Sequence, residues 1–346
     1  QWRNLLLALV VWGIFMTQAW LPLNPDGVPN MAWDLALHTM VSFLTNTNQQ
    51  HYAGQTQLSY LSQMVGIVGL QVITPMMGLA MVVATLRGLF GGRATGEGIA
   101  VFESGERDLG NYWVDLVRAT LRFMLPLCLA WSVLLASQGV PATLARGPTV
   151  TPIDASAGLE QQHIPLGPVA PMVAAKQLGT NGGGWYGPNS AMPFENPTPF
   201  SNFLETLALV LIPVAVTFMA GAFVRRRKFA ALIFGCMLAL SAVSTGLSVW
   251  SEARSGTAHD IALMEGKEVR FGAEDSALWT ALTTQTSNGS VNAMHDSLAP
   301  LTGGVAMVDM LINAIWGGIG CGLSQFLVYL LLAVFLAGLM TGRTPE

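Results

Sequence analysis

Long apolar runs alternate with shorter, partly polar segments along this chain, and the pattern predicts helices throughout. The long runs occupy residues 4–22, 60–86, 112–137, 203–224, 229–250 and 305–340. The shorter segments lie at 32–43, 169–178 and 275–285. A helix needs about 20 residues to cross the ~30 Å hydrocarbon core of a bilayer, so we expect the long runs to span it and the short segments to re-enter it. The order long, short, long occurs three times, which indicates an internal repeat.

Each short segment leads into a stretch rich in Thr, Ser, Asn and Gly. The first polar stretch is "TNTNQQ" at 45–50, the second is "GTNGGGWY" at 179–186, and the third is "TSNGSV" at 286–291. Non-helical backbone is not tolerated against lipid and survives at membrane depth only inside protein or around water. We therefore expect the polar stretches to converge around one aqueous axis. Three unrelated Asn-Gly turns in external loops are the alternative.

The uncharged oxygen atoms of these stretches point to a potassium site. Rings of carbonyl oxygens can replace the hydration shell of a potassium ion, whereas calcium and magnesium sites rely on carboxylates, which are nearly absent here. The residues that align across the repeat are Asn46, Thr47 and Asn48; Thr180, Asn181 and Gly182; and Ser287, Asn288 and Gly289. The third place of each triplet holds glycine or asparagine, the residues that best tolerate positive φ.

Composition agrees with a membrane protein. Hydrophobic residues make up 52% of the chain and charged residues 10%, against roughly 25% charged in soluble domains. The expected fold class is an all-α polytopic membrane protein built from repeated helix–pore helix–helix units. Residues 1–90 would form the first unit, 91–110 a cytoplasmic loop, 111–225 the second unit and 226–346 the third unit with a broken last helix. The net charge of −4 gives no reason to expect nucleic acid as a partner.

Basic residues predict which side of the membrane each loop occupies. If the long runs alternate in direction, most Arg and Lys residues fall on one side, which the positive-inside rule assigns to the cytoplasm. These are Arg3, Arg87, Arg93, Arg107, Arg225, Arg226, Arg227, Lys228 and Arg343. The polar stretches then face outside. Arg118 and Arg122 are expected to snorkel at the cytoplasmic interface, with Asp115 pairing with Arg118; a role in transport is the alternative.

The last apolar run, 305–340, is far longer than the ~20 residues that a span requires. It contains Gly317, Gly318, Gly320 and Gly322, which should interrupt a helix. We interpret this segment as a non-helical gating loop that lies across the pore and limits flow. Close helix packing through small residues is the alternative.

Candidate catalytic residues are few, and we predict none. His295 and Asp296 are adjacent, but no nucleophile accompanies them, and we expect a satisfied polar pair behind the third polar stretch. Cys128, Cys236 and Cys321 show neither metal-ligand nor disulfide spacing. The phosphate-binding G-x-x-x-x-G-K-[ST] pattern does not occur.

Five separated motifs carry a resemblance to a known family. They are "SFLTNTNQQHYAG", "QLGTNGGGWYGPNSAMPFENPT", "MEGKEVRFG", "SNGSVNAMHDS" and "AGLMTGRTPE". In this order and from end to end, the chain resembles the potassium-binding, channel-like subunit of the Kdp potassium pump, the KdpA family. The resemblance implies a fold of the potassium-channel-like superfamily. It also implies that the nine aligned residues form a potassium filter, flanked by Gln50, Gly183 and Thr286.

The resemblance further implies a multi-pass subunit of a complex in the bacterial inner membrane. The chain would bind potassium, its one ligand, and pass it inward without being an enzyme itself. A KdpB-type P-type ATPase subunit would hydrolyse ATP, with a KdpC-type subunit, a small KdpF-type peptide and membrane lipids as further partners. The family has a fourth unit and an additional N-terminal helix, so the sequence is expected to be a fragment. A stand-alone, potential-driven potassium transporter of the same superfamily is the alternative, and a membrane enzyme using His295 and Asp296 is the third hypothesis.

Overall fold

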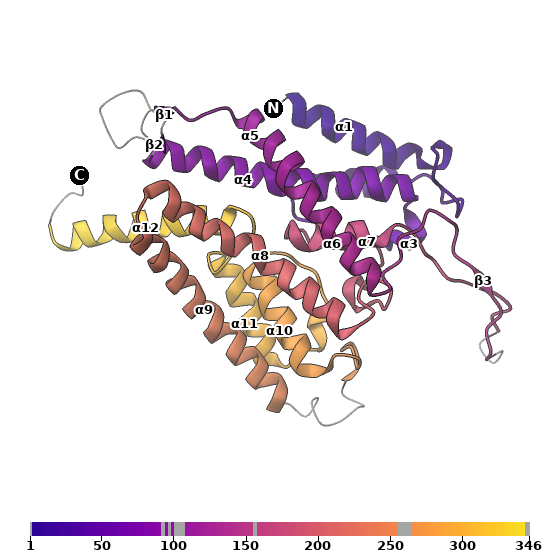
Figure 1. The fold of residues 1–346 in the computed structure, drawn as a ribbon. Coiled ribbons are helices and arrows are strands. Elements are labelled where there is room, and N and C mark those ends of the chain that lie inside the picture. The colour runs from indigo at the N-terminus through magenta and orange to yellow at the C-terminus, as the bar shows by residue number, and fades with distance from the viewer. Residues whose placement is uncertain are drawn as a thin grey trace.

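The computed structural model describes residues 2–90, 94–95, 98–99, 108–154, 158–254 and 264–342 (Figure 1). Most of the predicted loop 91–110, with Arg93 and Arg107, lies outside the described residues, as does Arg343. The described chain is nearly all helical. Strand is limited there to two short antiparallel pairs, β1 (Ala94–Thr95) with β2 (Gly98–Ile99) and β3 (Thr149–Val150) with β4 (Gln162–His163).

The first unit places a short helix between two longer ones. Its elements are α1 (Trp2–Thr17), the 3₁₀ turn η1 (Gln18–Trp20), α2 (Trp33–Leu44), α3 (Gly54–Gln57), the π-helical turn η2 (Ser62–Val68) and α4 (Gly69–Phe90). The predicted short helix 32–43 is confirmed as α2. α2 contacts both α1 and α4, and Phe15 of α1 and Phe43 of α2 are fully buried. The end of α2, where the first polar stretch begins, is therefore held inside the unit.

The second unit repeats this order. Its elements are α5 (Tyr112–Ala119), the π-helical turn η3 (Thr120–Met124), α6 (Leu125–Ser137), α7 (Val169–Leu178), the 3₁₀ turn η5 (Asn189–Ala191) and α8 (Pro199–Val224). The predicted short helix 169–178 is confirmed as α7. The Thr198 side chain accepts a hydrogen bond from the Ser201 N–H, and Pro199 occupies the first turn, so local chemistry fixes where α8 begins.

The third unit ends in a broken helix. Its elements are α9 (Arg227–Arg254), α10 (Gly272–Gln285), the 3₁₀ turn η8 (His295–Ser297), α11 (Pro300–Ile312) and α12 (Cys321–Met340). The predicted short helix 275–285 lies within α10. The expected interruption of the last apolar run is confirmed, because α11 ends at Ile312 and α12 begins at Cys321. We call residues 313–320 the glycine segment.

Five described helices are long and apolar enough to cross a membrane, so the chain is a polytopic membrane protein. They are Ser62–Phe90, Tyr112–Ser137, Pro199–Val224, Arg227–Arg254 and Cys321–Met340. The sequence pattern predicted six. The difference arises at the first run, where α1 has only 16 residues and reaches ~24 Å at ~1.5 Å per residue. In the last run, only α12 is long enough to span.

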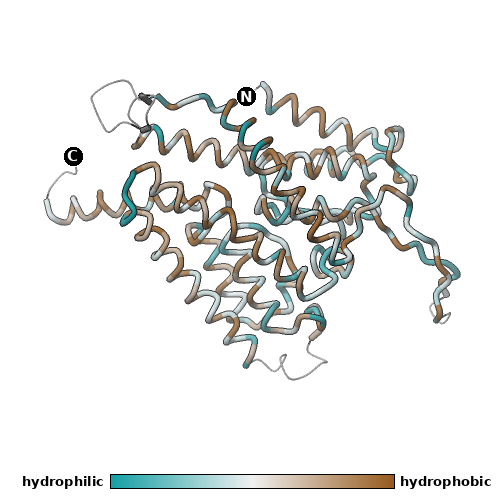
Figure 2. Tube along the Cα trace, in the orientation of Figure 1, coloured by the Kyte–Doolittle hydropathy of each residue, from teal (hydrophilic) through white to brown (hydrophobic). Residues whose placement is uncertain are grey.

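The short helices occupy the interior, and the long ones form the apolar exterior. α7 contacts α4, α6 and α8, whereas α10 contacts α8, α9 and α11. Most residues of α7 and α10 are buried. By contrast, only 11% of the most apolar 18-residue stretch of α12 is buried. Figure 2 shows brown along the long helices and teal mainly at their connections. Polar backbone therefore lies inside, where it does not face lipid.

The expected pairing of Asp115 with Arg118 is wrong. Arg87, near the end of α4, pairs with Asp115 instead and donates from Nη2 to Oδ1 at 3.3 Å. Arg118 and Arg122 are exposed. The packing of α4 against α5 brings a distant arginine to this carboxylate and replaces the i,i+3 pair that the sequence suggested.

Candidate functional site

The three polar stretches share one unusual backbone conformation. The first aligned residue of each has a positive φ: +61° at Asn46, +51° at Thr180 and +52° at Ser287. The third does too: +54° at Asn48, +87° at Gly182 and +90° at Gly289. A non-glycine residue in this region costs on the order of 1–3 kcal/mol, most clearly when it is β-branched like Thr180. Strain that recurs at equivalent places of a repeat makes these positions candidates for a functional role.

The same hydrogen bonds close the short helix before each stretch. The middle aligned N–H donates to a carbonyl in the last turns of the helix: Thr47 to Ser42 at 2.9 Å, Asn181 to Lys176 at 2.9 Å and Asn288 to Thr283 at 2.8 Å. The next N–H in each stretch donates to the same helix residue. Asn48 and Gly182 donate to the Ser42 and Lys176 carbonyls, and Gly289 donates to the Thr283 hydroxyl. Each stretch therefore continues directly from a helix C-terminus, where the partial negative charge of the helix dipole favours a cation.

The second polar stretch contacts both of the others. A Cβ atom on Gly182 would lie 2.1 Å from the carbonyl oxygen of Asn288 and 2.7 Å from the Ser290 nitrogen. The Asn288 amide donates to the Lys176 carbonyl at 3.0 Å. On the other side, the Asn181 and Asn46 side chains are in contact. Segments from all three units thus meet at one place.

The predicted flanking residues hold the second stretch. The Gln50 amide and the Gly184 peptide exchange two hydrogen bonds, at 3.0 and 2.9 Å. Gln71 of α4 donates to the Gly183 carbonyl at 2.7 Å. Gly183 itself has little room, because a Cβ there would lie 2.7 Å from the Phe43 ring. The first unit therefore braces the backbone of the second.

The glycine segment lies directly against the polar stretches. A Cβ on Gly318 would lie 3.2 Å from both the Thr180 hydroxyl and the carbonyl of the fully buried Thr286. Positive φ values at Gly317, Gly318 and Gly320 shape this approach. Gly322 is the second residue of α12, and a Cβ there would lie 2.2 Å from the Trp316 carbonyl. The four predicted glycines therefore lie close together beside the candidate filter.

Hydrogen bonds tie the glycine segment to the end of α10 and to the third polar stretch. The Gln285 carbonyl, at the end of α10, accepts from the Trp316 and Gly317 nitrogens at 3.1 and 2.7 Å. The Ser287 hydroxyl bonds the Asn313 amide oxygen at 2.5 Å. The segment and the third polar stretch are consequently anchored to the same helix end.

A cavity of about 340 Å³ lies between the polar stretches and the glycine segment. The first aligned residues, Asn46, Thr180 and Ser287, line it together with Thr286 and residues of α4. Its floor includes Gly317 and Gly318, and the described residues that line it carry no formal charge. The cavity offers backbone and hydroxyl oxygens without carboxylates.

Several residues around this site could not be found by sequence reasoning. Gln71, Asn189 and Asn313 are bonded to the polar stretches from other elements. Lys176 is fully buried behind the second stretch and forms an ion pair with Glu195. A buried lysine in a short apolar helix was the available signal, but its partners lie too far along the chain to be read from spacing.

The other sequence candidates lie apart from this site. His295 and Asp296 line a separate cavity, and His295 Nε2 has no hydrogen-bond partner among the described residues, contrary to the expected satisfied pair. Burial lowers the pKa of His295. Within the described ranges, no group of three or more His, Cys, Asp or Glu side chains could hold a metal ion.

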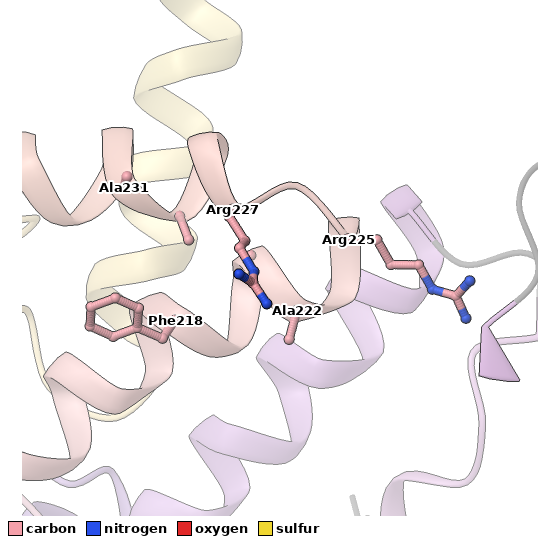
Figure 3. A pocket seen from close by; sticks show the side chains of 7 residues that line it. Phe218, Ala222, Arg225, Arg227 and Ala231 are labelled. Carbon is pink, nitrogen blue, oxygen red and sulfur yellow. The ribbon is translucent and has the colours of Figure 1, made fainter.

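A further cavity, of about 510 Å³, lies at the turn between α8 and α9 (Figure 3). Arg225 and Arg227 both line it, and Arg227 extends beside Ala222 in this view. Gly221 permits the close helix approach, since a Cβ there would lie 2.2 Å from the Ala230 Cβ. Basic side chains at the ends of two candidate spans fit the prediction that this turn lies on the cytoplasmic side.

Repeated long and short helices, each short helix ending in a strained polar loop beside a common cavity, define a polytopic membrane protein with an internal repeat. The chain belongs to the potassium-transporting ATPase A subunit family, KdpA, whose model matches residues 2–346. This confirms the resemblance drawn from the five motifs.

Curated relatives carry the name potassium-transporting ATPase potassium-binding subunit. The chain is 47% identical over 350 residues to the one from Pseudomonas putida and 48% identical over 350 residues to the one from Pseudomonas entomophila. It is 42% identical over 360 residues to the one from Gloeobacter violaceus. Each match covers 99% of this chain, which spans 59% of the length of the two Pseudomonas relatives and 60% of the third.

Proposed function

We propose that this chain binds potassium and passes it inward as part of an ATP-driven potassium uptake complex in the bacterial inner membrane. The observation that carries the proposal is the recurrence of one strained backbone conformation at the ends of three short helices beside an uncharged cavity. Such loops offer carbonyl and hydroxyl oxygens, which suit a dehydrated monovalent cation. The helix C-termini add partial negative charge without the carboxylates that would favour divalent ions.

The nine aligned residues are the proposed filter. Their contacts support a joint role, because the second stretch touches the third through Gly182 and Asn288 and touches the first through Asn181 and Asn46. Gln50, Gly183 and Thr286 flank the filter. Potassium is the transported ligand, and we propose no other cofactor for this chain.

The glycine segment is the proposed restriction to flow. Gly318 approaches Thr180 and Thr286 closely, and Gly78 of α4 packs against the other side, where its Cβ would lie 2.7 Å from the Ile319 carbonyl. A segment held on both sides below the polar stretches can block passage until it moves. The alternative is that these glycines only allow close helix packing. A deletion within residues 317–322 distinguishes the two roles.

The names of the relatives support a place in an ATPase complex, and the family resemblance supplies the proposed partners. A potassium-binding subunit of an ATPase leaves hydrolysis to another chain, for which we propose a KdpB-type P-type subunit, joined by a KdpC-type subunit and a small KdpF-type peptide. The chain itself is proposed to be non-hydrolytic. The exposed apolar faces of its long helices would contact membrane lipids.

Ion binding to the full-length subunit in its complex tests this function. We expect potassium, and to a lesser extent rubidium, to raise the thermal unfolding temperature relative to sodium or choline at equal ionic strength, because a ligand that binds only the folded state stabilises it. Potassium-stimulated ATP hydrolysis should appear only with the partner subunits present. Equal stabilisation by all four cations would refute the filter, and potassium uptake driven by membrane potential without ATP would favour the stand-alone transporter.

A further inference from the structure

A buried polar cluster lies behind the second polar stretch, and potassium coordination does not by itself explain it. Lys176 of α7 is fully buried, and its ammonium group donates to the Asn189 amide oxygen at 2.6 Å and the Ser190 hydroxyl at 2.6 Å. Its third contact is the ion pair with the equally buried Glu195. All three ammonium donors are thereby used.

Asn189 connects this lysine to the proposed filter. Its amide oxygen accepts from Lys176 and from the Ser190 nitrogen, the latter at 2.9 Å. Its amide nitrogen donates to the Gly182 carbonyl at 2.5 Å. Because an ammonium group can only donate, the lysine fixes which end of the Asn189 amide faces Gly182. Asn189 itself adopts a φ of +58°, which directs the side chain into this position at a cost in backbone strain.

The Lys176 backbone also forms hydrogen bonds with the second polar stretch. Its carbonyl accepts from the Asn181 and Gly182 nitrogens at 2.9 and 3.3 Å and from the Asn288 amide at 3.0 Å. The Gly182 residue is therefore bonded at both its nitrogen and its carbonyl oxygen. A glycine at positive φ is otherwise free to rotate its peptide plane, which would exchange a carbonyl for an N–H.

Stability alone does not account for such a cluster. Replacing a buried ion pair by apolar side chains of similar volume is often neutral or stabilising, so a pair of this kind is weak evidence for a contribution to stability. The pair instead holds the lysine, and through it the Asn189 amide, in one orientation. Glu195 neutralises the lysine, and the Tyr186 backbone nitrogen donates to the other Glu195 oxygen at 2.8 Å. The filter is thus supported by a fixed amide without a net positive charge beside the ion path.

We propose that Lys176 and Asn189 are specificity-determining positioning residues, in which the lysine orients the asparagine amide and the amide fixes the Gly182 peptide plane. This inference rests on the function proposed above. Neither side chain contacts the ion; both act through the Gly182 carbonyl. Loss of the fixed plane should allow the filter to fit ions of other sizes, so selectivity should change more than folding does.

The test measures the ratio of apparent affinities for potassium and sodium in the full-length subunit within its complex. Asn189→Asp keeps the acceptor for Lys176 but replaces the donor that faces Gly182, and Lys176→Met/Glu195→Leu removes the buried pair together. A hydrogen bond contributes about 0.5–1.5 kcal/mol, so we expect each variant to lower the potassium-to-sodium ratio about twofold to tenfold.

The chain offers a matched control. Lys267 and Glu252 form a second fully buried pair, at 2.7 Å, and Glu252 also accepts from the nitrogen of Ala299, which lies outside the polar stretches. Lys267→Met/Glu252→Leu should therefore leave the affinity ratio unchanged, even if the unfolding temperature shifts.

Each outcome bears on the inference. An unchanged ratio in Asn189→Asp, with potassium still bound, overturns the positioning role and leaves the proposed function intact. An equal fall of the ratio in the Lys267→Met/Glu252→Leu control would also overturn it, because a general loss of rigidity would then suffice. Absence of selective potassium binding in the parent protein would refute the proposed function itself. If the Lys176→Met/Glu195→Leu variant does not fold, Asn189→Asp alone decides.

Discussion

Two glycines occupy the same place in the repeat but have different surroundings, and this difference gives a sharp test of the filter. Gly182 and Gly289 have φ values of +87° and +90°. A Cβ on Gly182 would lie 2.1 Å from the Asn288 carbonyl oxygen, whereas a Cβ on Gly289 meets nothing within 4 Å. Replacing each by alanine therefore applies the same backbone strain at both positions and a steric clash at only one.

The expected magnitudes follow from these contacts. An L-residue in the left-handed region costs roughly 1–2 kcal/mol, and this cost applies to both variants. Gly182→Ala must also displace backbone of the third polar stretch, and forced overpacking of this kind costs about 1–3 kcal/mol more. We expect the second cost to act directly on the ion site, so that Gly182→Ala weakens apparent potassium affinity at least about tenfold, equivalent to ~1.4 kcal/mol. Gly289→Ala should weaken it less.

The measurement is potassium-dependent thermal unfolding and potassium-stimulated ATP hydrolysis of the full-length complex. Gly27→Ala is the control for strain alone, because Gly27 has a φ of +65°, lies outside the polar stretches and has nothing within 4 Å of its would-be Cβ. It should lower the unfolding temperature without changing potassium affinity. An effect of Gly289→Ala equal to or larger than that of Gly182→Ala would refute the reasoning from close approach.

Three further predictions follow from other parts of the molecule. Deleting two residues from 317–322 should raise passive potassium flux through proteoliposomes while the unfolding curve stays close to that of the parent; a joint loss of stability and flux would instead identify packing glycines. In a cysteine-free background, Ala53→Cys should react with an impermeant thiol reagent in intact cells and Arg226→Cys should not, and the opposite labelling would invert the orientation. Burial lowers the pKa of His295, so the unfolded state takes up this proton more readily and stability should fall as the pH drops below about 6.5. His295→Gln should flatten that part of a plot of unfolding temperature against pH, and an unaltered slope would show that another group is responsible.

The order and type of the elements around the site could be predicted from the sequence alone. Short helices at 32–43, 169–178 and 275–285 were predicted within a few residues, because their length, their apolar content and the Asn/Gly-rich stretches that end them are local properties. The alignment of Asn46, Thr180 and Ser287 rested on the same local chemistry and matches the shared positive φ. The break in the last apolar run could also be predicted from the sequence, because clustered glycines weaken a helix regardless of tertiary context.

Other features depended on which segments pack together. The partner of Asp115 is Arg87 on α4 rather than Arg118 one turn away, and the first apolar run forms a helix too short to span by itself. The ion pair differs because helix spacing describes a single segment, whereas an ion pair also depends on the segments packed against it, here α4 against α5.

The residues that support the candidate filter could be identified only from the packing of the folded chain. Lys176, Asn189 and Glu195 lie at different points of the second unit, and their contacts with Gly182 exist because α7 and the turn around η5 fold against each other. The contrast between Gly182 and Gly289 also depends on packing. Both positions require a positive φ and hold glycine, so the sequence does not distinguish them. Backbone preferences act between chain neighbours and are written in the sequence, whereas the distance from Gly182 to the Asn288 carbonyl is set by the packing of units that are far apart along the chain.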